Sequence, residues 1–368
     1  MGLTRYGAGR QEIEGLLASW GENPYRARQL WDGLYRRRAP LEDLTDLGRE
    51  LRARLAEALP LELTPCTTST TDDGDTLKWL WNATAGAEVE TVLMRYPSPG
   101  NVVSPKAPGD GVSPKARATV CVSSQAGCAM GCTFCATGQA GFERHLTAGE
   151  IVEQVARAQH ASPQRVSNVV FMGMGEPLAN FDATWAAIQR LHGDFGISAR
   201  HITVSTVGIP PGIRRLAAQP LPVTLAVSLH APDDELRDQL VPINRRYPLT
   251  EVLAAAAGYL ETSGRRLSFE YAMIDGVNDS PAQAGALARR LRGLGAHVNL
   301  IPLNPTAGFG VPATPPDRIA RFADRLRTGG VNTTVRRNRG TTIDAACGQL
   351  RARHRSEPAT MVRATRED

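Results

Sequence analysis

The chain has 368 residues, of which 42% are hydrophobic and 21% charged, and it carries a formal net charge of +5. No apolar run approaches the roughly 20 residues of a membrane span and the N-terminal residues lack a signal-peptide core, so we expect a soluble cytoplasmic protein without membrane contact. Six cysteines in so long a chain do not form a disulfide scaffold, and the positive charge is compatible both with an acidic partner and with arginine-rich codon usage.

The first 62 residues are predicted to form a small helical domain. Asn23 and Pro24 supply a helix cap and a first-turn proline, after which apolar residues recur at helical spacing. Those apolar residues are Ala27, Leu30, Trp31, Leu34 and Tyr35. The other side of the same segment is basic and holds Arg26, Arg28, Arg36, Arg37 and Arg38. This cationic face suits an acidic partner, and a merely solvated charged face is an equal alternative.

Residues 63–117 are predicted to form a β ribbon and a linker. The segments TLKWLWN and EVETVLMRY read as two strands joined by a turn. The stretch 98–115 that follows is rich in Pro, Gly and Ser, and the pentapeptide VSPKA occurs twice in this region, at 103–107 and 112–116. This stretch lacks apolar residues to bury, so we expect a mobile insert.

From residue 118 to residue 350 the pattern changes to strand, loop and helix in repetition. The strand candidates are 118–124, 166–173, 201–206, 222–230, 267–274, 297–304 and a last short one at 332–336. The helix candidates are 147–160, 181–193, 210–218, 249–262, 281–293 and 315–327. This alternation predicts an α/β fold with a parallel sheet covered by helices, in which the loops after the strand carboxyl ends carry the function. Residues 351–368 are polar and basic, and we expect a flexible tail.

Half of the cysteines lie together after the first strand of this region, at Cys128, Cys132 and Cys135, with the spacing C-x3-C-x2-C. Three thiolates are one too few for a closed zinc site, which would need a fourth ligand such as His145 or Cys121. They also suit three irons of a [4Fe–4S] cluster whose fourth iron stays open to a chelating ligand. Their position at the mouth of the first strand–helix unit favours the iron–sulfur interpretation.

Several motifs occur in an order that resembles a known family. They are SSQAGCAMGCTFCATG, GMGEPLAN, VSTVGIP, SLHAP, LIPLNP and IDAACGQL. The cysteine spacing, with Phe134 before the last cysteine, resembles the radical S-adenosylmethionine superfamily. The whole set resembles its dual-specificity 23S rRNA/tRNA (adenine-carbon-2) methyltransferase family over nearly the whole chain. The resemblance implies a partial (β/α)6 barrel of radical-SAM type, one [4Fe–4S] cluster per chain held by the three clustered cysteines, and S-adenosyl-L-methionine chelated by the open iron.

The resemblance also assigns residues that contact S-adenosylmethionine. Gly173 and Gly175 follow the second strand and would let the backbone approach the ligand, while Gly175 and Glu176 would meet its amino group. The other expected contacts come from the ends of later strands and are Ser205, Ser228, Leu229, His230 and Asn304. From the residues alone, each of these later groups is explained at least as well by its place at a strand end.

Two further cysteines and a glutamate have catalytic roles in the family. By its setting in AACGQL, Cys347 matches the residue that accepts a methyl group from one S-adenosylmethionine, and a second one activates this S-methylcysteine through a radical, so two are used per turnover. Cys121 is expected to release the RNA from Cys347 through a transient disulfide, and Glu90 to remove the proton from carbon 2. Without the resemblance, both cysteines read as buried apolar residues and Glu90 as a strand carboxylate. Cys66 has no motif around it.

The function implied by the resemblance is methylation of carbon 2 of an adenosine in 23S rRNA and of an adenosine near the tRNA anticodon. The expected partners are these RNAs, bound by the helical domain at 1–62, and an electron donor such as flavodoxin or ferredoxin; we expect a monomer. A related enzyme that methylates carbon 8 and confers antibiotic resistance shares all the cysteines and is an alternative. A zinc-containing RNA-binding protein without catalysis is a second alternative. The insert at 98–115 departs from the family pattern and separates Glu90 from Cys121.

Overall fold

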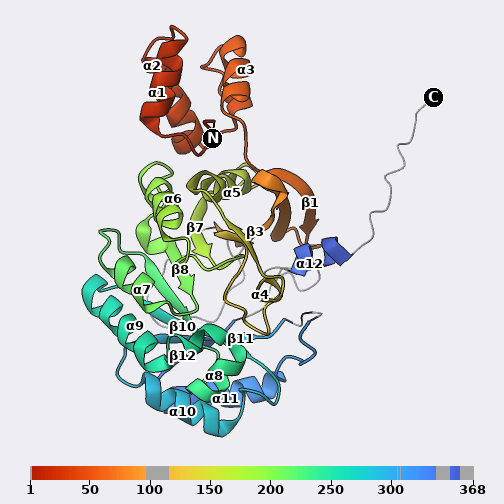
Figure 1. Ribbon diagram of the computed structural model, residues 1–368, viewed down its shortest axis with the longest axis vertical. Helices are drawn as coiled ribbons and strands as arrows, with labels where there is room; N and C mark the ends of the chain where they lie inside the picture. Colours follow the sequence, from red (N-terminus) through yellow and green to blue (C-terminus); the bar gives the residue numbers. More distant parts are fainter. Residues whose placement is uncertain (1, 97–115, 305, 307, 337–348, 357–368) are drawn as a thin grey trace, which may run out of the picture.

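The computed structural model describes residues 2–96, 116–304, 306, 308–336 and 349–356, so that the insert at 98–115 and Cys347 lie outside the described residues. Three helices form one end of the molecule, and the rest of the described chain builds a large twisted sheet with helices on its outer side (Figure 1). Among the described helices, none is long and apolar enough to cross a membrane.

The N-terminal end consists of α1 (Arg10–Ser19), α2 (Tyr25–Trp31) and α3 (Arg49–Ala58), with a π-helical turn (Asp32–Arg37) that continues α2 and a 3-10 turn (Leu41–Asp43). All apolar residues of the predicted helical stripe, from Ala27 to Tyr35, are buried, which confirms the predicted helix face. On the basic side Arg28, Arg36 and Arg37 are exposed. Arg26 and Arg38 are half-buried, and Arg38 donates to the Phe195 carbonyl, so part of the predicted cationic face is exposed and part of it packs against the protein.

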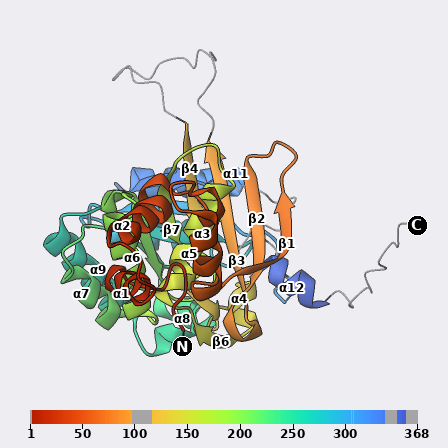
Figure 2. The same cartoon turned by 90° about the horizontal axis from the view of Figure 1, so that it is seen from above.

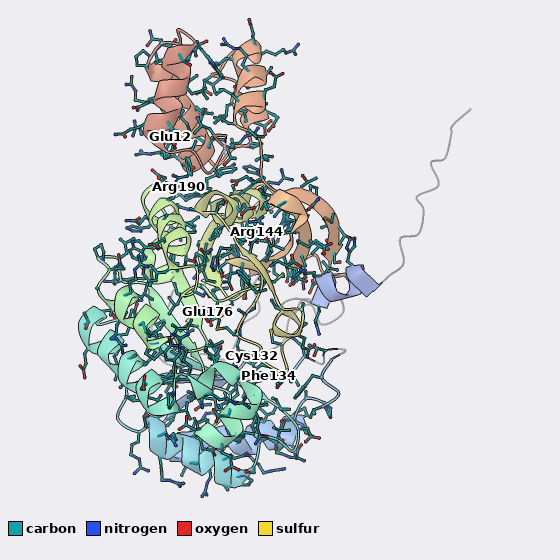
Figure 3. All side chains as sticks on the ribbon, viewed as in Figure 1. Glu12, Cys132, Phe134, Arg144, Glu176 and Arg190 are labelled. Atoms are coloured by element: carbon teal, nitrogen blue, oxygen red, sulfur yellow. The ribbon has the colours of Figure 1, made fainter. Side chains whose placement is uncertain are left out.

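Aromatic and charged side chains join this end to the sheet-bearing part of the chain. The indole Nε1 of Trp31 donates to Asp194 at 3.0 Å. Arg190 donates to the Tyr6 carbonyl and lies over the ring of Tyr35 at 6.0 Å from its centroid (Figure 3). Seen from above, the N-terminal helices cover α5 and α6 and leave β1 and β2 to one side (Figure 2).

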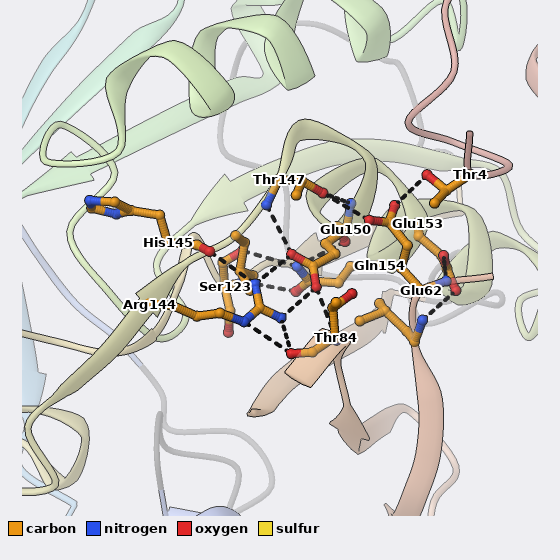
Figure 4. A network of polar contacts seen from close by, with 12 residues as sticks. Thr4, Glu62, Thr84, Ser123, Arg144, His145, Thr147, Glu150, Glu153 and Gln154 are labelled. Atoms are coloured by element: carbon orange, nitrogen blue, oxygen red, sulfur yellow. Dashed lines mark hydrogen bonds and ion pairs between the residues drawn. The ribbon is translucent and has the colours of Figure 1, made fainter. Parts of the chain in front are cut away.

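Carboxylates fix the segment that leads from the N-terminal end into the sheet (Figure 4). Glu153 on α5 (Ala148–His160) accepts the N–H groups of Glu62 at 2.8 Å and Leu63 at 3.1 Å. The Glu62 side chain accepts in turn from Thr4 at 2.8 Å and Thr147 at 3.2 Å. This network orients the N-terminal helices because its acceptors are buried or half-buried at the junction.

The described strands form a ten-stranded sheet in the order β1-β2-β3-β4-β7-β8-β9-β10-β11-β12. They are β1 (Thr64–Thr70), β2 (Thr76–Asn82), β3 (Glu88–Tyr96), β4 (Arg117–Cys121), β7 (Val166–Phe171), β8 (Ile202–Thr206), β9 (Thr224–Ser228), β10 (Leu267–Met273), β11 (His297–Pro302) and β12 (Asn332–Val335). β1 to β4 pair antiparallel, whereas β4 and β7 to β12 are all parallel. The linear order makes the barrel partial, as expected.

Two features of the sheet differ from the prediction. The predicted ribbon is not a separate unit, because β3 pairs with β4 and thereby extends the main sheet by three antiparallel strands. An isolated hairpin would be marginal in water, and pairing with β4 gives its apolar side chains a core to enter. A second small sheet of β5 (Gln125–Gly127) and β6 (Phe142–His145) flanks the cysteine loop and was not predicted.

Helices alternate with the parallel strands and cover the outer side of the barrel (Figure 1). They are α5, α6 (Phe181–Gly193), α7 (Pro210–Ala217), α8 (Asp234–Leu240), α9 (Leu249–Ser263), α10 (Pro281–Leu291) and α11 (Pro316–Thr328), with a short α4 (Ala136–Gln139) beside the cysteines. The expectation of a flexible tail from residue 351 is wrong for its first residues, because α12 (Gln349–Ser356) is helical and Arg351 is buried. Ion pairs of Arg351 with Glu88 and Glu143 hold this helix against β3 and β6.

Candidate active site

A cavity of about 600 Å³ opens at the carboxyl ends of the parallel strands. Its walls come from β2, β3 and β4, from the cysteine loop between β5 and β6, and from the ends of β7 to β11. The expected site residues that line it are Glu90, Cys121, Cys135, Gly175, Glu176, Ser205, Ser228, His230 and Asn304. The parallel sheet brings these residues together because the carboxyl ends of its strands meet at one edge.

Backbone contacts give the cysteine loop its shape. The N–H of Cys128 donates to the Gly141 carbonyl at 2.8 Å, and that of Cys135 to the Cys132 carbonyl at 3.2 Å. Gly127 has a φ of +76°, and a Cβ added there would lie 2.0 Å from the Gly141 oxygen. Only glycine fits this position. The close pairing of β5 with β6 therefore fixes the position of Cys128, the residue that follows Gly127.

Of the three clustered cysteines, Cys132 is buried, whereas Cys128 and Cys135 are half-buried. Burial raises the pKa of the Cys128 thiol to about 12 and also raises the pKa of Cys132. No three His, Cys, Asp or Glu side chains within the described ranges are arranged as ligands of a single metal ion. His145, the alternative zinc ligand, is exposed, and its Nδ1 lies 3.0 Å from the Gln125 amide. Three sulfur donors on one loop beside a cavity fit the ligands of an iron–sulfur cluster.

His230 is held as a neutral imidazole at the cavity wall. It has a φ of +60°, and its Nδ1 accepts the N–H of Ala272 at 3.0 Å while its carbonyl accepts from Asn278 at 2.8 Å. Burial lowers the pKa of His230 to about 3, so the ring carries its proton on Nε2. Phe134 packs edge-on against this ring with a centroid separation of 4.8 Å, which links the cysteine loop to the end of β9 (Figure 3).

The glycines after β7 are required by packing, a reason that adds to the expected one. A Cβ on Gly173 would lie 2.6 Å from the Val122 carbonyl oxygen, and one on Gly175 would lie 2.7 Å from the Gln125 nitrogen. Gly175 also has a φ of +98°. Both glycines line the cavity, but the space a side chain would take is filled by the segment between β4 and β5. Close packing of two protein segments therefore requires them.

Glu176 ties the same turn to the next strand. Its carboxylate accepts the N–H of Leu178 at 3.0 Å and the N–H of Val207 at 2.8 Å. Its own N–H donates to the Gln125 side chain at 2.7 Å. Burial raises the pKa of Glu176 to about 7, although these backbone donors oppose the shift. The residue thus borders the cavity while its oxygens already bridge the segments that follow β7 and β8.

The residues at the carboxyl ends of β8 and β9 and on β10 differ in whether their side chains line the cavity. Ser205 and Ser228 line the cavity, whereas the side chain of Leu229 is fully buried in the core and its N–H donates to the Glu270 carbonyl at 3.0 Å. Glu270 was not expected in the site. Its Oε2 atom is buried and accepts no hydrogen bond from the described residues, with Arg336 Nη1 at 3.7 Å. A ligand hydroxyl or amino group in the cavity would satisfy this oxygen.

Glu90 and Cys121 share one wall of the cavity with a buried lysine. Val92 lies opposite both Lys78 on β2 and Cys121 on β4 in the strand register. Glu90 is two residues from Val92 and therefore on the same face, where its Oε2 lies 3.0 Å from Lys78 Nζ. Burial raises the pKa of the Cys121 thiol to about 11.

Sequence reasoning missed four charged residues that build this site. They are Lys78, Arg237, Glu270 and Arg351. Lysine at 78 carried a weak signal, because it is one of very few lysines in an arginine-rich chain and interrupts an apolar strand. The other three carried none, because a single charged residue in a helix or strand is usually exposed.

Comparison with known proteins agrees with this architecture. The radical SAM superfamily profile matches residues 122–284, and the profile of the ribosomal RNA large subunit methyltransferase N-terminal domain matches residues 6–60. A crystal structure of a radical SAM methyltransferase from Sphaerobacter thermophilus superposes with a TM-score of 0.85 at 48% identity, covering 95% of this chain and 99% of the other.

Curated relatives extend over almost the whole chain. A probable dual-specificity RNA methyltransferase RlmN from Parafrankia sp. (strain EAN1pec) is 52% identical, with 97% of this chain and 92% of the relative covered. A protein of the same description from Thermobifida fusca (strain YX) is 50% identical, with 93% of each chain covered. The chain therefore belongs to the RlmN family of dual-specificity RNA methyltransferases, within the radical SAM superfamily.

Proposed function

We propose that this protein is a cytoplasmic radical-SAM RNA methyltransferase that methylates carbon 2 of an adenosine in 23S rRNA and of an adenosine near the tRNA anticodon. The observation that carries the proposal is the single cavity that Cys135, Glu90 and Cys121 all line. It joins the cysteine loop of a radical enzyme to a carboxylate and a thiol that neither cluster binding nor S-adenosylmethionine binding explains. The relatives named as dual-specificity RNA methyltransferases support the choice of substrate.

Membership of the superfamily implies a [4Fe–4S] cluster and S-adenosylmethionine. We assign Cys128, Cys132 and Cys135 as the cluster ligands and the cavity residues from Gly175 to Asn304 as the surroundings of S-adenosylmethionine. When bound, these groups supply radical chemistry, which carbon 2 of adenine needs because it is an electron-poor sp² carbon without a nucleophilic lone pair. One cluster per chain and two S-adenosylmethionine molecules per turnover are part of the proposal.

Cys347 is proposed to carry the methyl group as S-methylcysteine, and it lies outside the described residues. Support comes from the described residues that follow it. Four positions later, the backbone N–H of Arg351 donates to Glu90 Oε1 at 2.8 Å. The helix α12 thus starts at the wall of the cavity, where a methyl carrier is needed.

Glu90 is proposed to accept the proton that leaves carbon 2. One of its carboxylate oxygens faces the Lys78 ammonium and the other faces a backbone N–H, the arrangement of an ionised, acceptor-only carboxylate. Proton transfer to a positioned carboxylate of this kind typically contributes about 10²- to 10⁴-fold to a rate.

Cys121 is proposed to release the product. Its thiolate attacks the Cys347 sulfur, the carbon–sulfur bond to the RNA adduct breaks, and the electron pair of that bond stays with carbon and takes up a proton. The two thiols end as a disulfide, which an external thiol reduces. Because burial raises the pKa of Cys121 to about 11, this step needs a base to take the thiol proton.

RNA is proposed to contact the exposed arginines of the N-terminal end, Arg28, Arg36 and Arg37. Phosphate contacts of this kind make affinity fall steeply as salt rises. A monomer acting with an external electron donor such as flavodoxin or ferredoxin completes the proposal.

The test is mass spectrometry of nucleosides from 23S rRNA and tRNA treated with the anaerobically reconstituted protein, S-adenosylmethionine and a reductant. We expect about four irons per chain and 2-methyladenosine in both RNAs. 8-Methyladenosine would contradict methylation at carbon 2, and stoichiometric zinc without methylation would contradict the proposal that the protein is an enzyme.

A second experiment tests the release step. Cys121→Ala should trap a protein–RNA adduct. Cys66→Ala, which changes an exposed cysteine on β1, should not.

A further inference from the structure

Lys78 is buried behind the cavity wall and does not reach solvent. Its side chain is 0% exposed and that of Glu90, its partner at 3.0 Å, is 2% exposed. Taking an ammonium and a carboxylate out of water costs several kcal/mol per ion, and apolar residues of similar size often serve stability as well or better. A fully buried pair at the wall of a reaction cavity therefore points to a role beyond stability.

The pair controls the orientation of the Glu90 carboxylate. Lys78 holds Oε2, the backbone N–H of Arg351 holds Oε1 at 2.8 Å, and the hydroxyl of Ser123 donates to the Glu90 carbonyl at 2.6 Å. Glu90 lines the cavity, while Lys78 lies behind it. β2 and α12 thus each hold one carboxylate oxygen of Glu90, while the segment between β4 and β5 holds its backbone carbonyl.

The other charges near this wall have their own partners. Arg351 on α12 pairs with Glu143 and Glu88, and Arg336 after β12 faces Glu270 at 3.7 Å. Cys121 faces the pair from β4 as a thiol. Lys78 contacts the Glu90 carboxylate with its ammonium nitrogen, whereas Arg351 contacts it through the backbone N–H.

We propose that Lys78 is a positioning residue for methyl transfer, which holds Glu90 ionised and aimed at the cavity so that it can accept the carbon-2 proton. The inference rests on the proposed function, in which Glu90 is the base. After Glu90 accepts the proton, its attraction to the buried Lys78 ammonium is lost. This favours return of the proton to solvent and resets the base.

The kinetic test compares Lys78→Met, Lys78→Arg and wild type in the reconstituted enzyme, in single turnover, with RNA that carries deuterium at carbon 2 of the target adenosine. Lys78→Met should slow resolution of the protein–RNA adduct about 10- to 100-fold, retain deuterium in the trapped adduct, and move the acid limb of the pH–rate profile to higher pH. Lys78→Arg should keep most of the rate because it keeps the charge. Arg318→Met is the matched control, since it breaks ion pairs with Asp275 and Asp279 that lie outside the cavity lining.

A double-mutant cycle separates a positioning role from a structural one. In the Glu90→Gln background, Lys78→Met should cause no further loss of rate if Lys78 acts through Glu90. Equal losses in both backgrounds would overturn the proposal. So would adduct resolution by Lys78→Met at the wild-type rate and with the wild-type pH profile.

An infrared measurement covers the case in which Lys78→Met does not fold. The difference spectrum between the unreconstituted wild-type protein and Glu90→Gln at pH 6 should contain a carboxylate band, and a carboxylic acid band in its place would contradict the proposal. This readout needs no activity. If the wild-type protein failed to methylate RNA, the proposed function would fall, whereas the infrared result would still report on the Lys78–Glu90 pair.

Discussion

Arg237 on α8 holds the loops that rim the cavity, and we predict that Arg237→Met opens them. The guanidinium is fully buried and donates to the carbonyls of Val207, Ser228 and Leu229 and to Asn244 Oδ1 at 2.6 Å. These acceptors lie at or just after the ends of β8 and β9, or in the 3-10 turn after α8 (Pro242–Arg245). One side chain thus fastens three segments of backbone.

The structure allows the cost of the substitution to be worked out. The Leu229 carbonyl keeps the Ala231 N–H at 2.8 Å, so the main loss falls on the carbonyls of Val207 and Ser228 and on the buried Asn244 Oδ1. A buried acceptor deprived of its donor costs about 1–3 kcal/mol. Burial lowers the pKa of Arg237 to about 10, so removal of the cation recovers part of that cost. We expect the local opening free energy to fall by about 2–4 kcal/mol.

Hydrogen exchange measured by mass spectrometry resolves this local effect without requiring two-state unfolding of the whole chain. Peptides covering residues 205–209 and 228–244 should exchange roughly 30- to 1000-fold faster in Arg237→Met. Arg237→Lys should give an intermediate result, because a lysine reaches fewer acceptors. Arg325→Met, at an exposed position on α11, is the control. Exchange in these peptides within about threefold of wild type would refute the reasoning.

Two further predictions concern the junction and the cysteine loop. Burial raises the pKa of Glu153 from about 4.5 to about 7, so the folded state binds the proton more tightly and stability should fall as pH rises through this window. In thermal unfolding from pH 4.5 to pH 8 this slope should be smaller in Glu153→Gln than in wild type, because the raised pKa of Glu176 contributes to it in both proteins; a slope of unchanged size in the variant would assign it to other groups. Gly127→Ala should lose iron loading, because its Cβ would meet the Gly141 oxygen. Gly21→Ala has the same φ of +76° with open space around it, so it isolates backbone strain, and equal iron loading in the two variants would contradict the steric argument.

Local patterns along the chain predicted much of this fold. The helix expected at 181–193 is α6 (Phe181–Gly193), and the strand expected at 201–206 is β8 (Ile202–Thr206). These segments were predictable because apolar periodicity and turn residues act over a few neighbouring positions. The cysteine motif and the glycine-rich turn at 173–175 could also be recognised from the sequence, because each lies within a single loop.

The contacts between distant residues at the candidate site could not be predicted from local sequence patterns. Glu90 was recognised from its motif, but its pairing with Lys78 depends on the register between β2 and β3, and α12 reaches Glu90 across 261 positions of sequence. The sequence motif predicts ligand approach for Gly173 and Gly175, but it does not reveal that packing against the segment after β4 also requires them. Register and helix docking arise from the simultaneous burial of many distant side chains, so they become visible only when the whole sheet is assembled.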